Sequence, residues 1–267
     1  MTQLKDAVVV LTGAAGGFGR EFTRQLLQAG SRLILTDIDE KLLRDRITEI
    51  RQEIASGEII AYWNIDLASS AGCETLYTRI KSLNLPVDIL INNAGLGLFG
   101  RMDEVPVAKW ERLMEINLIS PMRLSSLFIA DAIARRQGHI VNISSMAGWV
   151  APAGMAHYST SKFGLRGFSE GLYNEVKAYN VKVTAVYPFF SRTPILQSEG
   201  YGTLAGNKEI NDRLISDPAR VIKNTIRAIE KDRLHVFPDR IGKSIHLLKQ
   251  YFPSLLDWLG ARGTRNK

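Results

Sequence analysis

Residues 7–19 read Ala-Val-Val-Val-Leu-Thr-Gly-Ala-Ala-Gly-Gly-Phe-Gly, an apolar run that turns directly into glycine. The run is apolar on both faces, as in a strand of a parallel sheet that helices cover on both sides. The glycines let backbone N–H groups approach a bound group closely, and the start of a following helix attracts negative charge. The stretch predicts a phosphate cradle between a strand and a helix, although tight turns also use glycine for purely steric reasons.

Short apolar runs alternate with longer stretches of helical spacing along the rest of the chain. The runs predict strands at Ala7–Thr12, Arg32–Asp37, Ile59–Asn64, Ile89–Asn92, His139–Ser144, Val181–Tyr187 and Leu234–Phe237. The intervening stretches predict helices at Gly19–Ala29, Asp39–Ile54, Ser69–Ser82, Val107–Arg136, Tyr158–Ala178, Pro194–Arg213, Pro218–Lys231 and Ile241–Leu259. Pro121 should kink or interrupt the fourth helix. The alternation predicts an α/β fold: a doubly wound, mostly parallel seven-stranded sheet with helices on both faces, in a single domain.

The composition is that of a globular protein. With 45% hydrophobic and 23% charged residues, the 267-residue chain can bury a large core as one domain over residues 1–267. Cys73 has no partner for a disulfide within the chain, and the first apolar run is too short for a signal peptide or a membrane span. We therefore expect a cytoplasmic protein. Residues 189–217 are expected to form a mobile substrate lid, and residues 240–267 a C-terminal helical extension.

Asp37 closes the second expected strand, where an acidic side chain accepts hydrogen bonds from the ribose hydroxyls of a dinucleotide. The same carboxylate would repel a 2′-phosphate, and Ile38 offers no cation in compensation. Arg20 is the one nearby cation, and we expect it to face solvent on its helix. These residues favour NAD over NADP as the cofactor. The alternative for Asp37 is a cap on the helix that follows.

Residues 158–162 read Tyr-Ser-Thr-Ser-Lys and place a phenol and an ammonium on the same face of an expected helix. A tyrosine with a pKa of about 10 is a poor base at neutral pH, and a nearby cation favours the phenolate. Ser145 follows an apolar strand and can hydrogen-bond a substrate oxygen. Residues 89–95 form another strand that ends in polar and then small side chains. Because such strand ends meet at one edge of a parallel sheet, they predict a ligand crevice there.

Taken in order, these motifs resemble those of the short-chain dehydrogenase/reductase family over nearly all 267 residues. The matching pieces are Thr-Gly-x-x-x-Gly-x-Gly at 12–19, Asp37, Asp66-Leu67, Asn92-Asn93-Ala94-Gly95, Asn117, Ser145, Tyr158-x-x-x-Lys162 and the segment from Pro188 to Thr193. Each piece alone is weak, whereas the whole set in this order is specific. The resemblance implies a Rossmann-like, NAD(P)-binding oxidoreductase that acts on CH–OH groups.

The resemblance also implies roles for individual residues. Its catalytic group of four corresponds to Asn117, Ser145, Tyr158 and Lys162. Its cofactor site corresponds to Gly13, Gly17, Phe18 and Gly19 at the pyrophosphate, Asp37 at the ribose, Asp66 and Leu67 at the adenine, Asn93, Ala94 and Gly95 at the adjoining ribose, Lys162 at the nicotinamide ribose, and Pro188 and Thr193 at the carboxamide. Tyr158 also belongs to this cofactor site. Asn117 would hold the water that links Lys162 to bulk solvent.

The function implied by these roles is hydride transfer between the nicotinamide and the carbon of a secondary alcohol or ketone. Tyr158 as phenolate would take the hydroxyl proton while Ser145 steadies the developing carbonyl. One departure concerns the nicotinamide end, because the family usually has glycine where this chain has Phe189, and Ser191 replaces a more usual aliphatic residue. The alternative function is a non-catalytic dinucleotide-binding protein that senses redox state or acts as a scaffold.

The substrate is expected to be apolar, such as a steroid, a retinoid or a long-chain alcohol or ketone. The side chains expected to face the crevice are Leu96, Leu98, Phe99, Met146, Trp149, Met155, Phe189, Phe190, Ile195 and Leu196. Such a set occurs just as often in a protein core. His157 should point away from Tyr158 on the helix and is expected to be structural.

The C-terminal part carries most of the net charge of +7, because residues 217–267 hold eleven Lys and Arg against five Asp and Glu. One interpretation of the last helix is that it lies on an anionic membrane surface, which would make the protein membrane-peripheral. The other, which we favour from the sequence, is that it packs on the lid or on a partner subunit of a homodimer or homotetramer. No recognisable nucleic-acid-binding motif is present, so we expect no nucleic acid partner, and we expect no metal.

Overall fold

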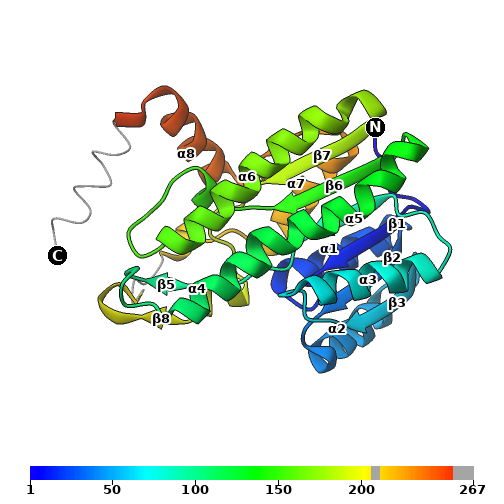
Figure 1. Cartoon of the computed structure of the whole chain (residues 1–267), viewed down its shortest axis with the longest axis horizontal. Helices are drawn as coiled ribbons and strands as arrows, with labels where there is room; N and C mark the ends of the chain where they lie inside the picture. The colour runs from blue at the N-terminus through cyan, green and yellow to red at the C-terminus, as the bar shows by residue number, and fades with distance from the viewer. Residues whose placement is uncertain (206–210, 255–267) are drawn as a thin grey trace.

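A sheet of seven parallel strands forms the centre of the molecule (Figure 1). In the order in which they lie side by side, the strands are β3 (Glu58–Asn64), β2 (Arg32–Asp37), β1 (Val8–Thr12), β4 (Ile89–Asn92), β6 (Gly138–Ile143), β7 (Val181–Val186) and β9 (His235–Val236). The direction of winding switches between β1 and β4, and open α/β sheets bind ligands beyond the carboxyl ends of strands at such a switch. This computed structural model describes residues 1–205 and 211–254, and it confirms the predicted doubly wound sheet in a single domain.

Helices cover both faces of the sheet, which explains why its strands are apolar on both sides. One face is covered by α1 (Gly17–Gln28), α2 (Glu40–Glu53) and α7 (Pro218–Glu230), and the other by α3 (Ser70–Ser82), α5 (Ser120–Arg135) and α6 (Ala156–Val176). Leu11 of β1 is buried in the first layer, whereas its neighbour Val10 is buried in the second. Cys73 lies fully buried in the second layer, where burial raises the pKa of its thiol, and it serves there as a small apolar side chain.

The long fourth helix is interrupted as Pro121 predicts. It consists of α4 (Val107–Met114), a single π-helical turn at Glu115–Ile119, and α5. Pro121 has no N–H to donate to the carbonyl four residues earlier, and the π-helical turn lies immediately before it. Residues 107–135 together pass a test of length and hydropathy for a membrane span, with a mean hydropathy of 1.2. The inner helices of folded domains pass the same test, and Phe128 of α5 is buried beneath the sheet.

The helix predicted over Pro194–Arg213 is wrong. Short 3₁₀ turns at Pro194–Gln197 and Gly202–Leu204 flank a two-residue strand, β8 (Gly200–Tyr201), which pairs with β5 (Phe99–Gly100). Gly202 has a φ of +63°, which a helix does not allow. The glycines therefore end helical structure here, and residues 206–210 of the expected helix lie outside the described part of the chain.

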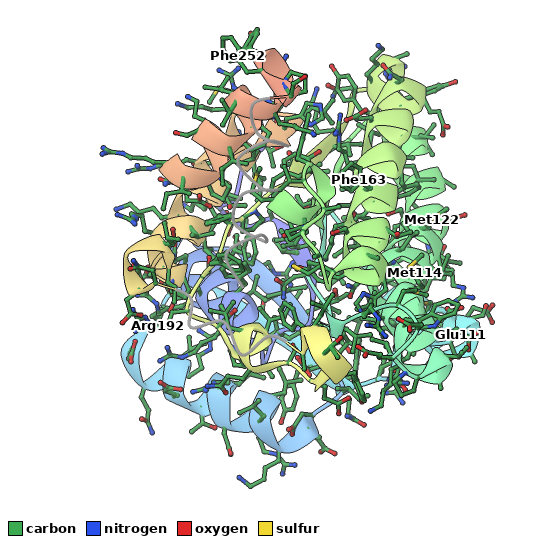
Figure 2. The ribbon with its side chains drawn as sticks, turned by 90° about the vertical axis from the view of Figure 1, so that its left-hand side faces the viewer. Glu111, Met114, Met122, Phe163, Arg192 and Phe252 are labelled. Carbon is green, nitrogen blue, oxygen red and sulfur yellow. The ribbon has the colours of Figure 1, made fainter. Side chains whose placement is uncertain are left out.

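The last described helix, α8 (Arg240–Tyr251), begins one residue before its predicted start. Residues 255–259 of the predicted helix lie outside the described residues. The remaining expected strands and helices begin and end within two residues of their predicted bounds. α8 stands at one end of the molecule with Phe252 beyond its last turn, whereas Phe163 lies on the separate face that α6 contributes (Figure 2).

Candidate active site

The glycine-rich turn after β1 leaves backbone donors open at the start of α1. The cap residue Gly16 has no side chain to accept their hydrogen bonds, so the first N–H groups of α1 remain available to an anion. Gly13 has a φ of +64°, and a Cβ built on it would lie 2.7 Å from the Cα of Ala94. The turn therefore requires glycine at residue 13 and lies directly on the end of β4.

Asn93 braces this turn with its side chain. Its Nδ2 donates to the carbonyls of Thr12 and Gly13 at 3.0 and 2.9 Å. The Oγ1 of Thr12 accepts from the N–H groups of Asn93 and Ala94, both at 3.0 Å. Since the amide nitrogen of Asn93 is committed to the turn, the expected contact of this residue with a ribose would come from its Oδ1 or its backbone.

Asp37 is turned toward the same glycine-rich turn. Its Oδ2 accepts from the N–H of Ala15 at 2.9 Å, and its Oδ1 accepts from the N–H of Asp39 at 3.2 Å. The cap of α2 is Asp39, whose side chain accepts from the N–H of Leu42 at 2.9 Å. The alternative in which Asp37 caps that helix is therefore wrong, and its carboxylate lies beside the phosphate cradle.

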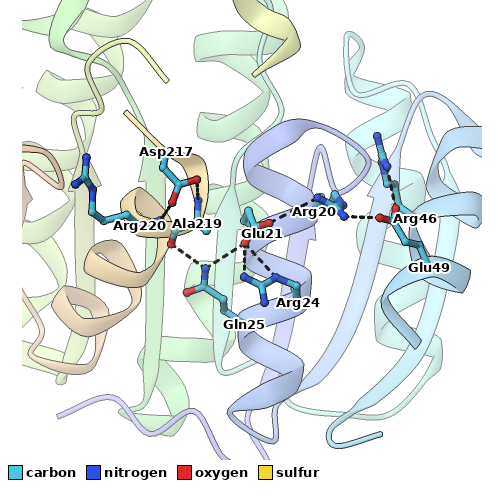
Figure 3. Close-up of polar contacts among 9 residues, drawn as sticks. All are labelled: Arg20, Glu21, Arg24, Gln25, Arg46, Glu49, Asp217, Ala219 and Arg220. Carbon is cyan, nitrogen blue, oxygen red and sulfur yellow. Dashed lines mark hydrogen bonds and ion pairs between the residues drawn. The ribbon is translucent and has the colours of Figure 1, made fainter. Parts of the chain in front are cut away.

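We expected Arg20 to face solvent, but its side chain is paired with carboxylates. Its guanidinium forms an ion pair with Glu49 of α2 and lies 3.8 Å from the carboxylate of Glu21, so that only 34% of the side chain is exposed (Figure 3). Arg46 also pairs with Glu49, at 2.9 Å. The positive charge nearest to the cradle is thus held by carboxylates of this chain.

The loop after β3 carries Asp66 and Leu67, the residues expected near an adenine. The Oδ1 of Asp66 accepts from the N–H of Ala68 at 2.9 Å, and its Oδ2 pairs with Arg112 of α4 at 3.2 Å. Leu67 is 5% exposed and belongs to the core layer with α3 and α5. Asp66 therefore lies at the surface of this loop, while Leu67 anchors it.

Tyr158, in the first turn of α6, meets Ser145 beyond the end of β6. The side chain of Tyr158 is buried and forms a hydrogen bond with that of Ser145. Burial raises the pKa of the phenol above its ordinary value, and the bond to Ser145 offsets only part of this rise. The hydroxyl of Tyr158 is therefore protonated at neutral pH in the chain itself.

Lys162 lies one turn further along α6 and is also buried. Its Nζ donates to the carbonyl of Ile143 at 3.0 Å and lies 5.7 Å from the centre of the Tyr158 ring. Burial lowers the pKa of this ammonium to about 8. In the chain on its own, burial sets the direction of the Tyr158 pKa. The expectation that Lys162 together with a positively charged nicotinamide favours the phenolate stays a prediction.

Asn117, in the π-helical turn, clamps the loop after β4. Its Oδ1 accepts from the N–H of Leu96 at 2.8 Å, and its Nδ2 donates to the carbonyl of Leu96 at 3.0 Å. A Cβ built on Gly95 would lie 3.4 Å from this Oδ1 and 3.7 Å from the Nζ of Lys162. Because the side chain is engaged, a water held by Asn117 would bind its backbone carbonyl, to which Pro121 cannot donate.

The segment after β7 connects the two ends of the site. The carbonyl of Pro188 accepts from the N–H of Met146 at 2.9 Å, beside Ser145. Five residues on, the methyl group of Thr193 covers the glycine-rich turn, where a Cβ built on Gly17 would lie 2.6 Å from it. The segment therefore runs from the proton-transfer pair to the phosphate cradle.

Five of the ten apolar side chains expected to face the crevice fall into two clusters. Leu98 and Met155 pack in one cluster with Tyr158. Met146 and Trp149 pack in another, together with the partly buried ring of Phe189, Tyr187, Phe237 and Ile245 of α8. The second group is core packing between the sheet and α8, so only the first lies at the proton-transfer residue.

His157 is buried as a structural residue would be. It is 4% exposed, and burial lowers the pKa of its imidazole. Within the described residues neither ring nitrogen has a hydrogen-bond partner.

A family model for the short chain dehydrogenases matches residues 7–202. The chain belongs to the short-chain dehydrogenase family. A 3-ketodihydrosphingosine reductase of Bos taurus is 33% identical over 250 residues, which cover 92% of this chain and 74% of that protein. A family member from Burkholderia phymatum in complex with NAD superposes with a TM-score of 0.82 at 24% identity, covering 96% of this chain and 97% of that one. One from Sphingobium yanoikuyae in complex with NADPH gives 0.76 at 25% identity, covering 97% and 94%.

The chain is therefore an oxidoreductase of the short-chain dehydrogenase family, with the fold that binds a nicotinamide dinucleotide. The open amides at the start of α1 and the carboxylate of Asp37 fit such a cofactor. Sequence reasoning placed Thr12 in the glycine motif without giving it a role, and it missed Arg112 and Asp239. Thr12 opens the glycine motif and was within reach. Arg112 pairs with Asp66, 46 residues away, and Asp239 accepts a hydrogen bond from Phe189, 50 residues away. No local sequence pattern indicates either contact.

Proposed function

We propose that this protein transfers hydride between NAD(H) and a ketone or secondary alcohol on a long apolar molecule, chiefly in the direction of reduction. The observation that carries the proposal is the buried Tyr158, hydrogen-bonded to Ser145 with Lys162 one helical turn away. When bound, the nicotinamide supplies or accepts the hydride. The protein supplies the proton, its position, and the exclusion of water.

Each residue of the site has a task in this proposal. Ser145 donates a hydrogen bond to the substrate oxygen, where negative charge develops during reduction. Tyr158 gives that oxygen its proton, and the raised pKa of the phenol keeps the proton available at neutral pH. Lys162, with a pKa of about 8, can release a proton toward the phenolate that is left.

NAD is supported by the charges around the adenosine end. The carboxylate of Asp37 lies at the cradle, and Ile38, which follows it, is 55% exposed and uncharged. Arg20 is already held by Glu49. A 2′-phosphate would meet one fixed negative charge and no free positive one among these residues.

The apolar substrate is supported by the surroundings of Tyr158. Leu98 and Met155 pack against the same cluster as the phenol, which favours a hydrocarbon chain next to the reacting carbon. The relative from Bos taurus is by name a reductase of 3-ketodihydrosphingosine. A long-chain ketone is therefore the substrate class that we test first.

The test is a panel of long-chain, steroid-like and retinoid-like ketones and alcohols, followed by nicotinamide absorbance with NAD(H) and NADP(H). Tyr158→Phe should lower kcat by about 10²–10⁴ because the proton donor is lost, while NADH still binds and quenches protein fluorescence. Tyr179→Phe is the matched control, since this tyrosine is 44% exposed beyond the end of α6. Undiminished turnover by Tyr158→Phe would refute the assignment.

A further inference from the structure

Asp239 is a buried carboxylate that joins two distant parts of the chain. Only 8% of the residue is exposed. Its Oδ2 accepts from the N–H of Phe189 at 2.9 Å, and its Oδ1 accepts from the N–H of Gly242 at 2.6 Å. The first bond holds the segment after β7, and the second caps α8. One side chain therefore fixes the start of α8 to that segment.

The segment held by this carboxylate lies directly against the loop of the catalytic serine. The carbonyl of Pro188, which precedes Phe189, accepts from the N–H of Met146 at 2.9 Å. Met146 follows Ser145, whose hydroxyl is hydrogen-bonded to Tyr158. A continuous path of hydrogen bonds and short stretches of backbone thus runs from α8 to the proton-transfer pair.

The first turn of α8 also presses on the same loop. A Cβ built on Gly242 would lie 3.2 Å from the Cγ of Met146 and 2.9 Å from the Oδ1 of Asp239. The ring of Phe189, which stands where the family usually has glycine, packs on the cluster that contains Met146. A shift of α8 would therefore move the neighbour of the catalytic serine.

We infer that Asp239 is a positioning residue, which holds Ser145 and the backbone of Pro188–Phe189 in place for hydride transfer by tying both to α8. The inference rests on the proposed function, because it assumes a catalytic role for Ser145. The two carboxylate oxygens serve two donors at once, each oxygen accepting from one of them. A serine at this position offers a single oxygen on a shorter side chain, and a methyl group accepts no hydrogen bond. Docking of the C-terminal helix is in this way coupled to the geometry of the site.

Three variants separate this role from simple helix capping. Asp239→Ala removes both acceptors, whereas Asp239→Ser keeps a hydroxyl that caps α8 but is too short to reach Phe189 as well. Asp217→Ala is the matched control. The carboxylate of Asp217 caps α7 by accepting from the N–H groups of Ala219 and Arg220. The segment after β7 is bonded to the backbone of the preceding residue, Ser216, and that backbone is left in place by the substitution.

Turnover is measured below the unfolding temperature of every variant. Both Asp239 variants should lose about tenfold to a hundredfold in kcat, the scale expected when catalytic groups are slightly misplaced, while Asp217→Ala stays within about twofold of the unchanged protein. Hydrogen exchange at the amide of Phe189 should become faster in both Asp239 variants and stay unchanged in the control.

Two results would overturn the inference: wild-type kcat in Asp239→Ser, which would leave only a helix cap, or unchanged exchange at Phe189 in Asp239→Ala. The exchange measurement needs no substrate. A wild-type chain that turns over nothing in the panel would therefore defeat the proposed function alone, and the exchange at Phe189 would still decide whether Asp239 holds this segment.

Discussion

Lys162 is the residue of the site whose burial is least favourable. It is 4% exposed, and its Nζ donates to one carbonyl, that of Ile143. Burial alone accounts for the fall of its pKa from 10.5 to about 8. An ammonium that gives up water without gaining a carboxylate destabilises the folded state. We infer that the position is kept for its chemistry, at the expense of stability.

Lys162→Met should therefore inactivate the protein and stabilise it. The unfolded chain holds the lysine proton up to a pKa of 10.5 and the folded chain only up to about 8, so the cost of burial is fully present below pH 8 and disappears as the pH rises toward 10.5. At pH 7 we expect a gain of about 1–3 kcal/mol in the free energy of unfolding, and a smaller gain at pH 10. Urea unfolding at both pH values measures it.

The control for this substitution is Lys223→Met, an exposed lysine on α7, which should change stability by less than about 0.5 kcal/mol. If Lys162→Met were less stable than the unchanged protein at pH 7, the ammonium would be stabilised by the site, and its lowered pKa would have to be rejected.

Most side chains of the site could be identified from the sequence, but their interaction partners and their burial could not. The order of motifs points to Tyr158, Lys162 and Ser145 because each carries its chemistry in its own residue type. The partners that decide their state come from afar: Arg20 meets Glu49 across 29 residues, and burial, rather than a neighbour four positions away, sets the pKa of Lys162. Pairings of this kind have no local pattern in a sequence.

At the level of elements, the π-helical turn lies next to Pro121 and contains Asn117, whose side chain binds the loop after β4. Pro121 withholds the N–H that a regular helix would donate to the carbonyl of Asn117. The wider turn before it, Glu115–Ile119, places the side chain of Asn117 against Leu96. The irregular turn thus sets the position of the loop that passes beside Lys162.

Pro121→Ala should let this turn close into an ordinary α-helix. The restored N–H adds a helical bond, so stability should rise or stay within about 1 kcal/mol, but Asn117 would rotate away from Leu96. We expect about a tenfold loss of kcat and faster exchange at the amide of Leu96. Pro218→Ala, at the start of α7, controls for the loss of a proline near a helix start. Unchanged exchange at Leu96 would show that the clamp does not depend on Pro121.

The sequence predicted correctly the helices and strands whose apolar pattern is long and periodic. The prediction was wrong for Pro194–Arg213, where β8 forms only by pairing with β5. The paired strands β5 and β8 have two residues each, too few for any period to show. They are held from outside: Glu104 accepts from the N–H of Thr203 at 2.8 Å, and Lys109 pairs with Glu199 at 2.8 Å. The apolar spacing after Pro194 suggested a helix, and these contacts with α4 and the loop before it override that pattern.

At the level of the whole molecule, α8 has one face that is covered and one that is exposed among residues 1–205 and 211–254. Its inner side packs on this chain's own cluster, with the ring of His246 stacked on Phe237 at 4.1 Å. Its outer side exposes Leu247, Tyr251 and Phe252 at 42%, 66% and 61%. Arg240 and Lys243 are exposed on the same side of the helix, one to three turns before them. Apolar tips beside cations suit an anionic lipid surface, where a lipid-like substrate would also be found.

We therefore expect the intact chain to sediment with phosphatidylcholine vesicles that contain phosphatidylserine, and much less with phosphatidylcholine alone or at high salt. Replacing Tyr251 and Phe252 together by serine should reduce this binding several-fold without loss of folding, because both side chains are exposed. Tyr62→Ser with Phe163→Ser is the matched control, since both are 41% exposed on other faces.

The expected homodimer or homotetramer stays a prediction, and light scattering on the same samples measures it. If sedimentation does not depend on Tyr251 and Phe252, while the chain is a dimer that these substitutions dissociate, then a second copy covers this face and the membrane contact is wrong.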